Sequence, residues 1–249
     1  MSSYPVAVTL AVGAEKTTNT VKKHPLGTMA VNVFGDMFRY CFSGEAIGAG
    51  QVVMAKAGVA NHDMDLATQA AAAIGATSVS VTLGATAATV DQYADGILYV
   101  NDGAGEGQKF RVHDHLAADA SATLTLNFYQ NDKVAEALAT ATSLCGLSEN
   151  KYKDVEIYDV NDVDGPAVGV AVVEVADNSY FWAQVHGSCN VLIDSTTVVL
   201  GSAVEASSAV DGSVGLADYS ANTDQKPIGV VELIVAVSTD YGMIHLTIE

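Results

Sequence analysis

The sequence has few of the features that would indicate a disulfide, linker or membrane protein. Its three cysteines, Cys41, Cys145 and Cys189, lie far apart and form no C-x-x-C pair. Such a sparse, odd set predicts reduced thiols in a cytosolic setting. No run approaches the roughly 18 apolar residues of a membrane span, and the first ten residues lack a signal-peptide pattern. Only four prolines are present, so a disordered linker is also excluded.

Basic residues are scarce and unevenly placed. The chain has 11 Lys and Arg against 29 Asp and Glu, which gives a net charge of −18. Residues 1–60 hold five basic and three acidic residues, whereas the remainder holds six and 26. An acidic body repels phosphates and argues against a nucleic-acid partner. One interpretation of this charge asymmetry is a solvated acidic surface. A more specific interpretation is that the N-terminal part faces a partner while the acidic part faces solvent.

Signatures of common enzyme classes are missing, including G-x-S-x-G, H-E-x-x-H and the P-loop. Gly103, Gly105 and Gly107 have the spacing G-x-G-x-G, whereas a dinucleotide site needs G-x-G-x-x-G at the start of a helix. Cys189 lies three residues after His186, but nothing else marks this pair as a nucleophile and base. Cys189 is instead expected to be a small buried hydrophobe. The sequence therefore predicts no enzyme and no cofactor.

Two segments carry residue types that bind cations. His113 and His115 are expected on one face of a strand, because side chains alternate with period two, and would form half of a metal site. No third ligand has a recognisable spacing. Asp159, Asp162 and Asp164 precede a glycine, but the EF-hand register places valine and alanine at its first and last ligand positions. We expect a polar strand edge and an acidic surface turn, with no metal.

Short strand patterns dominate the chain. Residues 96–115 contain two β-branched and aromatic segments joined by Asn, Asp and Gly residues, which predicts a β-hairpin with a glycine-rich tip. Residues 61–74 are rich in alanine, with Asn61 or Asp63 as the cap and Gly75 as the stop, and predict a helix. Residues 132–139 predict one or two helical turns. Residues 48–53 resemble residues 200–204, although this echo is too short to establish a duplication.

These patterns predict a mainly β fold, built from short-stranded sandwich or barrel-type domains with one or two short helices. We expect an N-terminal arm and docking segment over residues 1–60. A central β domain with the glycine-tipped hairpin would follow over residues 61–165. A C-terminal β domain would occupy residues 166–249.

Two parts of the chain resemble structural proteins of tailed bacteriophages. The first is YADGILYVNDGAGEGQ at residues 93–108, followed by a strand that ends near His113. The second has the rhythm of phage head decoration (cement) proteins. It comprises DGPAVGV at 164–170, YFWAQVHG at 180–187, VVLG at 198–201 and PIGV at 227–230. Together the motifs cover residues 75–249, and their order carries the resemblance.

The resemblance implies a non-enzymatic virion protein that binds the outside of the phage head and clamps neighbouring major capsid subunits. Such proteins are commonly trimers of compact β domains, some of the tulip kind. It implies that the partners are the major capsid protein and further copies of this chain in a homotrimer. It implies neither a nucleic-acid nor a membrane partner. The chain would be made in the host cytoplasm and end on the capsid exterior. Alternatives are a tail or major capsid component, or a module that binds host glycans.

If the resemblance holds, charge and aromatic clustering nominate the contact residues. Lys16, Lys22, Lys23 and Arg39 would meet acidic groups of the capsid. Phe181 and Trp182 would form trimer contacts, because their alternation along a strand favours a core or interface position over a sugar platform. A major capsid protein would need a long spine helix, and no long amphipathic period is present.

Overall fold

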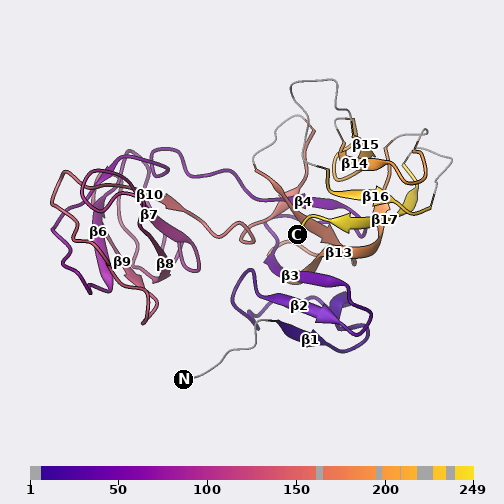
Figure 1. The fold of residues 1–249 in the computed structure, drawn as a ribbon, viewed down its shortest axis with the longest axis horizontal. Coiled ribbons are helices and arrows are strands. Elements are labelled where there is room, and N and C mark those ends of the chain that lie inside the picture. Colours follow the sequence, from indigo (N-terminus) through magenta and orange to yellow (C-terminus); the bar gives the residue numbers. More distant parts are fainter. Residues whose placement is uncertain (1–6, 161–164, 195–197, 208, 218–226, 234–238) are drawn as a thin grey trace. The chain divides into compact units, whose positions relative to one another are not determined.

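The computed structural model describes the chain except for residues 1–6, 161–164, 195–197, 208, 218–226 and 234–238. Within the described residues it contains strands and one 3-10 turn, η1 (Ala14–Lys16), so the predicted mainly β class is confirmed (Figure 1). The chain divides into two compact units, Met1–Lys56 with Lys151–Glu249 (unit 1) and Ala57–Asn150 (unit 2). Unit 2 is thus an insertion in the sequence of unit 1, with boundaries that differ from the predicted three-part division.

Unit 1 contains a branched sheet centred on one long strand, β13 (Tyr180–Leu192). Its other strands are β1 (Val8–Leu10), β2 (Met29–Asn32), β3 (Met37–Phe42), β4 (Val52–Met54), β11 (Glu156–Ile157), β12 (Ala167–Ala171), β14 (Ala203–Ala206), β15 (Val214–Leu216), β16 (Gly229–Val231) and β17 (Tyr241–Thr247). The N-terminal half of β13 pairs with β3 and β12, and its C-terminal half pairs with β17. The predicted N-terminal arm therefore supplies strands β1 to β4 of this sheet.

The C-terminal part of unit 1 curls towards a barrel. The order β13-β17-β16-β14-β15 is followed by a bridge from Val214 of β15 back to Ile193 at the end of β13. Inward-facing residues such as Val191, Val204 and Ile244 are fully buried there. Alternation of small branched residues fills the narrow interior, as short β-barrels require.

Unit 2 is a second, six-stranded sheet in the order β5-β10-β7-β8-β9-β6. Its strands are β5 (Leu66–Ala67), β6 (Ser78–Thr82), β7 (Ile97–Asp102), β8 (Lys109–Asp114), β9 (Thr123–Phe128) and β10 (Leu144–Ser148). A bridge from Thr68 to Val81 nearly closes it. The predicted hairpin is confirmed as β7 and β8, which are antiparallel with Leu98 opposite Phe110. Phe110 stacks on Phe128 with ring centroids 4.6 Å apart inside the core.

A paired turn recurs in both units. In each pair of turns, an apolar residue of one turn exchanges two backbone hydrogen bonds with an apolar residue of the other turn. The residue three positions after each of these apolar residues has positive φ. The pairs are Ile47 with Val175, Ala72 with Leu138 and Ala88 with Ala118, and the positive-φ residues are Gly50, Asn178, Gly75, Ala141, Asp91 and Ser121. In the echo of residues 48–53 and 200–204, Gly50 and Gly201 both have positive φ.

The predicted helices are wrong. Residues 61–74 form turns and β5, and residues 132–139 form an extended loop with one bridge at Leu138. Asn61 and Asp65 have φ of 65° and 60°, which a right-handed helix does not allow. Alanine favours a helix by less than about 1 kcal/mol per residue relative to most other residues. Burial of Leu66 and the bridges at Thr68 and Ala72 outweigh it.

Candidate functional site

Three lysines singled out from the sequence lie on one surface loop of unit 1. Lys16 ends η1, and Lys22 and Lys23 lie between η1 and β2, with all three side chains exposed. We call residues 16–25 the basic loop. Asn19 fixes it to the sheet, because its backbone exchanges two hydrogen bonds of 2.9 and 2.7 Å with Tyr180 of β13. The loop therefore places three positive charges at a defined position on a chain of net charge −18.

An aromatic cluster supports the C-terminal end of the basic loop. The His24 ring lies 5.2 Å from the Tyr40 ring and 5.3 Å from the Trp182 ring, and Tyr40 and Trp182 are 4.8 Å apart. The backbone N–H of Lys23 donates a 3.1 Å hydrogen bond to the Tyr40 hydroxyl. Burial raises the pKa of Tyr40, so this phenol stays neutral at physiological pH. The cluster ties the loop to β3 and β13.

The aromatic pair predicted as a trimer contact belongs to the interior of unit 1. Phe181 is 0% exposed and Trp182 is 5% exposed. They point to opposite faces of β13, where Phe181 joins the core around Val53 and Trp182 joins the core around Phe38. This burial agrees with the core position that strand alternation favours and leaves little side-chain surface at the pair.

Arg39, the fourth predicted capsid contact, is engaged within unit 1. Its guanidinium donates to the Glu249 carboxylate, with Nε 2.6 Å from Oε2, and to the carbonyl of Gly27 at 2.9 Å. Lys151 Nζ (3.0 Å) and the Tyr152 hydroxyl bind the same carboxylate. Burial alone would raise the pKa of Glu249, but these hydrogen bonds and the Arg39 charge lower it to about 2. Arg39 thus ties β3 to the C-terminal residue.

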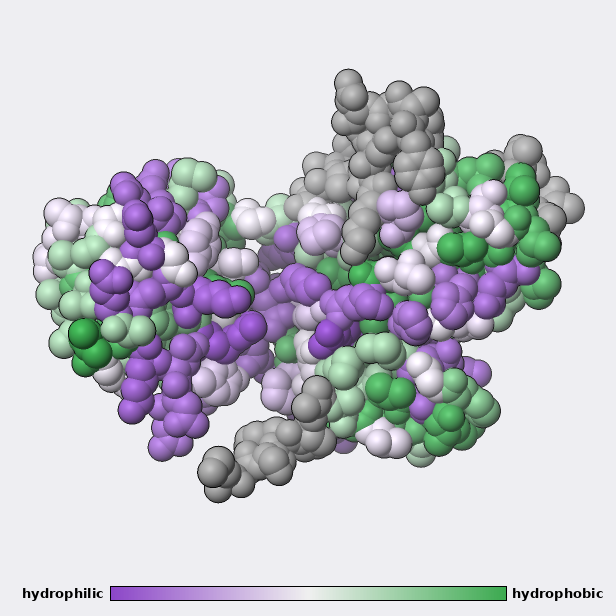
Figure 2. Space-filling model, in the orientation of Figure 1, coloured by the Kyte–Doolittle hydropathy of each residue, from purple (hydrophilic) through white to green (hydrophobic). Residues whose placement is uncertain are grey.

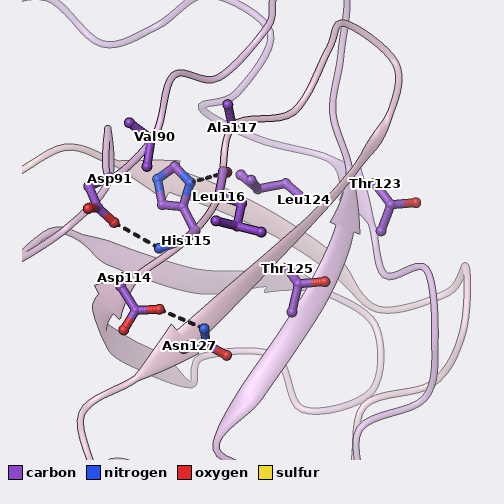
Figure 3. A pocket seen from close by; sticks show the side chains of 10 residues that line it. All are labelled: Val90, Asp91, Asp114, His115, Leu116, Ala117, Thr123, Leu124, Thr125 and Asn127. Carbon is purple, nitrogen blue, oxygen red and sulfur yellow. Dashed lines mark hydrogen bonds between the residues drawn. The ribbon is translucent and has the colours of Figure 1, made fainter.

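Unit 2 has a cavity of about 520 Å³ beside β8 and β9. Figure 3 shows the side chains around it, with Leu116 and Leu124 near the centre of the view and the hydrogen-bonded pair of Asp114 and Asn127 below them. Asn127 Nδ2 donates to Asp114 at 2.7 Å. This hydrogen bond, followed by one from His113, lowers the pKa of Asp114. The carboxylate is therefore ionised at neutral pH.

The expectation that His113 and His115 share one face of the strand is wrong. A bulge between Val112 and Asp114 inserts an extra residue opposite β9 and shifts the alternation by one. His113 is exposed and bonds to Asp114, whereas His115 is 2% exposed. Within the described residues no group of three or more His, Cys, Asp or Glu side chains could hold a metal ion. The acidic turn with Asp162 and Asp164 lies outside the described residues.

His115 belongs to a buried hydrogen-bond relay that the sequence did not reveal. Its Nε2 accepts the Tyr93 N–H at 2.9 Å, and its Nδ1–H donates to the carbonyl of Leu116 at 2.8 Å. The Tyr93 hydroxyl bonds His62 Nδ1, and His62 Nε2–H donates to Thr86 O at 2.9 Å. Each of the four ring nitrogens has a hydrogen-bond partner. The relay holds three loops of unit 2 together.

The cysteines behave as small core residues. All three are free and buried, in agreement with the prediction of unpaired thiols. Burial raises the pKa of Cys145 to about 11 and that of Cys189 to about 12, and it also raises the pKa of Cys41. Cys189 is 3% exposed, so the prediction that it is a small buried hydrophobe is confirmed.

The glycine-rich segment is the tip of the β7–β8 hairpin, as predicted, and β8 rather than a helix follows it. Gly103, Gly105 and Gly107 all have positive φ, which explains the three glycines by turn geometry. Among the described residues, no helix has the length and hydropathy that a membrane crossing requires.

Comparison with known proteins gives no relative for this chain. No family model, curated protein or solved structure matches it.

Proposed function

We propose that this chain is a decoration (cement) protein of a tailed bacteriophage, which binds the outside of the head and clamps neighbouring major capsid subunits. The proposal starts from the resemblance of residues 75–249 to such proteins. A mainly β architecture agrees with it, because strand-rich domains with non-local pairing suit a protein that must stay folded on a particle surface. The role is structural, without enzymatic chemistry, cofactor, nucleic acid or membrane.

The observation that carries the proposal is the basic loop. An acidic molecule needs a defined attachment face if it is to bind an acidic shell in one orientation. Lys16, Lys22 and Lys23 supply such a face, and the hydrogen bonds of Asn19 and Lys23 hold it against β13 and β3. Arg39 is not part of this face, because Glu249 binds its guanidinium.

Many weak contacts would suffice for clamping. A single exposed ion pair contributes about 0.2–1 kcal/mol. Several lysines per copy and many copies per shell multiply that contribution. Because the protein would bind the assembled shell and not free subunits, mass action would favour the assembled state. The expected homotrimer would add a second level of multivalency at the symmetry axes.

Co-sedimentation with empty heads tests this function. Purified protein is mixed with empty heads of the phage that encodes it, at about 0.15 M salt, where the Debye length is about 8 Å. We expect wild-type protein to sediment with the heads, and Lys22→Glu with Lys23→Glu to lower the affinity at least about tenfold. Lys109→Glu with Lys133→Glu makes the same charge change in unit 2 and should bind normally.

Each outcome has a separate meaning. Absence of wild-type binding would refute the decoration function and favour a tail component. Undiminished binding of the double loop variant would refute the docking role of the basic loop while leaving the function intact. A major capsid role has less support, because the described residues contain no helix longer than η1. A glycan module has less support, because Trp182 is buried.

A further inference from the structure

Four Asp-Gly pairs occur in the chain, at residues 95–96, 102–103, 164–165 and 211–212. In such a pair the glycine nitrogen can attack the side-chain carbon of the aspartate, because glycine has no Cβ that shields it. The product is a five-membered succinimide, which water opens to isoaspartate. The four pairs share this chemistry, so their surroundings decide which of them reacts. Asp164 lies outside the described residues, and the other three pairs can be compared.

The first of these pairs, Asp95 and Gly96, is held away from the reactive geometry. The Gly96 N–H donates a 2.9 Å hydrogen bond to the carbonyl of Tyr93. Asp95 is 6% exposed, and its carboxylate accepts a hydrogen bond from the Tyr129 hydroxyl. Both reacting groups are therefore bound to other partners inside unit 2, and a local opening must precede ring closure.

The pair of Asp211 and Gly212 is protected in a similar way. Gly212 is buried, and its N–H donates a 2.8 Å hydrogen bond to the carbonyl of Tyr158. The Asp211 carboxylate accepts the N–H of Val160 at 3.1 Å. Although Asp211 is exposed, the Gly212 nitrogen cannot turn towards it without losing a buried backbone hydrogen bond.

The nitrogen of Gly103 instead faces the carboxyl group of Asp102. Its N–H donates a 2.8 Å hydrogen bond to Asp102 Oδ1. A C–O bond of about 1.2 Å places the Gly103 nitrogen within about 4 Å of Asp102 Cγ, and a near-attack contact needs about 3–3.5 Å. Unit 2 carries many hydrophilic residues on the face shown in Figure 2, and Asp102 is exposed at the end of β7. Water therefore reaches the pair that has the reactive geometry.

We propose that Asp102 isomerises spontaneously to isoaspartate in the folded protein. The Gly103 nitrogen loses its proton and forms a bond to Asp102 Cγ, while the oxygen of the protonated carboxyl group leaves as water. One water then adds to the main-chain carbonyl carbon of Asp102 and breaks its bond to the Gly103 nitrogen. One water leaves and one enters, so the product has the mass of the original chain. The reaction needs neither an oxidant nor a second protein.

Isomerisation changes the path of the main chain at the hairpin tip. The main chain then runs through the side chain of residue 102, which adds one methylene carbon before Gly103. Gly103 already lies so close to the carbonyl of Thr142 that a Cβ would clash with it, and Asp102 pairs with Leu144 of β10. The longer path does not fit these contacts. We expect the isomerised chain to have a looser β7–β10 edge.

Ageing of the full chain in ¹⁸O-labelled water, followed by peptide mapping, tests the proposal. Mildly acidic buffer keeps part of each carboxyl group protonated, and every ring opening incorporates one ¹⁸O atom. In the folded protein the label should enter at Asp102 at least about tenfold faster than at Asp95 and Asp211, where a backbone hydrogen bond must open first. In concentrated urea the three rates should become similar. Electron-transfer fragmentation then identifies isoaspartate at position 102.

The matched control is Asp102→Glu, which keeps the carboxylate but requires a six-membered ring that closes far more slowly. Label at position 102 should fall to the background level in this variant, and label that persists would overturn the proposal. Uptake at Asp102 as slow as at Asp95 and Asp211 in the folded protein would also overturn it. Rates that stay equally unequal in urea would overturn the structural argument, because the sequence alone would then set the difference. Hydrogen exchange of the aged protein should be faster in β7 and β10.

Discussion

Glu249 provides the sharpest test of the electrostatics of unit 1. Its carboxylate binds Arg39, Lys151 and Tyr152, so it links the C-terminal residue to β3 and to the segment that re-enters unit 1 after the insertion. We consider Glu249→Gln, which keeps the size of the side chain, removes the charge and replaces one acceptor oxygen with an NH2 donor. The variant therefore removes the charge together with one set of accepted hydrogen bonds.

The magnitude follows from the shifted pKa. The pKa of Glu249 is lowered from 4.5 to about 2, because the donors outweigh burial. A folded-state pKa below the unfolded value stabilises the fold above the unfolded pKa, and that stabilisation disappears as the pH falls through the folded pKa. The full shift corresponds to about 3 kcal/mol. Because the side chain is 22% exposed, solvent screening reduces the expectation to about 2 kcal/mol.

Trp182 makes the measurement specific to unit 1. It is the single tryptophan of the chain and lies in β13, so its fluorescence reports unfolding of this unit alone. In urea at pH 7, Glu249→Gln should lower the free energy of unfolding by about 2 kcal/mol, and the difference should shrink between about pH 4.5 and pH 2. Glu174→Gln, an exposed acid in unit 1, should change little. A destabilisation that is equal at pH 7 and pH 2 would refute the reasoning.

Three further predictions concern turns, core and thiols. Gly103→Ala should destabilise unit 2 by more than about 2 kcal/mol, because φ is +83° and a Cβ would clash with Thr142 O. Gly107→Ala, at φ +85° with open space around it, should cost about 1 kcal/mol in chemical denaturation. Phe110→Ala should cost about 3–5 kcal/mol by removing the stack on Phe128, and hydrogen exchange should speed up in β7 to β9. The three cysteines should react with a thiol reagent at pH 8 only after unfolding, because their thiols are buried with raised pKa values; rapid labelling of native protein would contradict this.

Local rules predicted those features that depend on neighbouring residues. The β7–β8 hairpin followed from its Asn, Asp and Gly tip and the alternation on each side. The thiols were also predictable, because sparse cysteines without C-x-x-C spacing are usually unpaired core residues. For the hairpin, the controlling interactions lie within a few residues of the turn.

Features that depend on distant pairing were not predictable. The alanine-rich residues 61–74 satisfy helix propensity, but their backbone bridges run to residues around 81 and 138. The bulge in β8 separates His113 from His115 although strand periodicity places them together. The bond between Arg39 and Glu249 spans 210 positions, and no spacing rule anticipates it. The sequence predicted an N-terminal arm because β1 and β2 join the sheet only through β3, which pairs with the distant strand β13.

The paired turn also explains the composition of the chain. At these positions Ala72 and Ala88 are buried and Ala118 is partly buried, so small side chains fit well where the two turns exchange backbone hydrogen bonds. The position three residues later needs positive φ, which favours Gly and tolerates Asn, Asp and Ser. Each use of the turn thus adds alanine, glycine and short polar residues and leaves little room for lysine or arginine. Three of the chain's 11 lysines and arginines, Lys16, Lys22 and Lys23, lie on the basic loop, and the proposed function rests on these three.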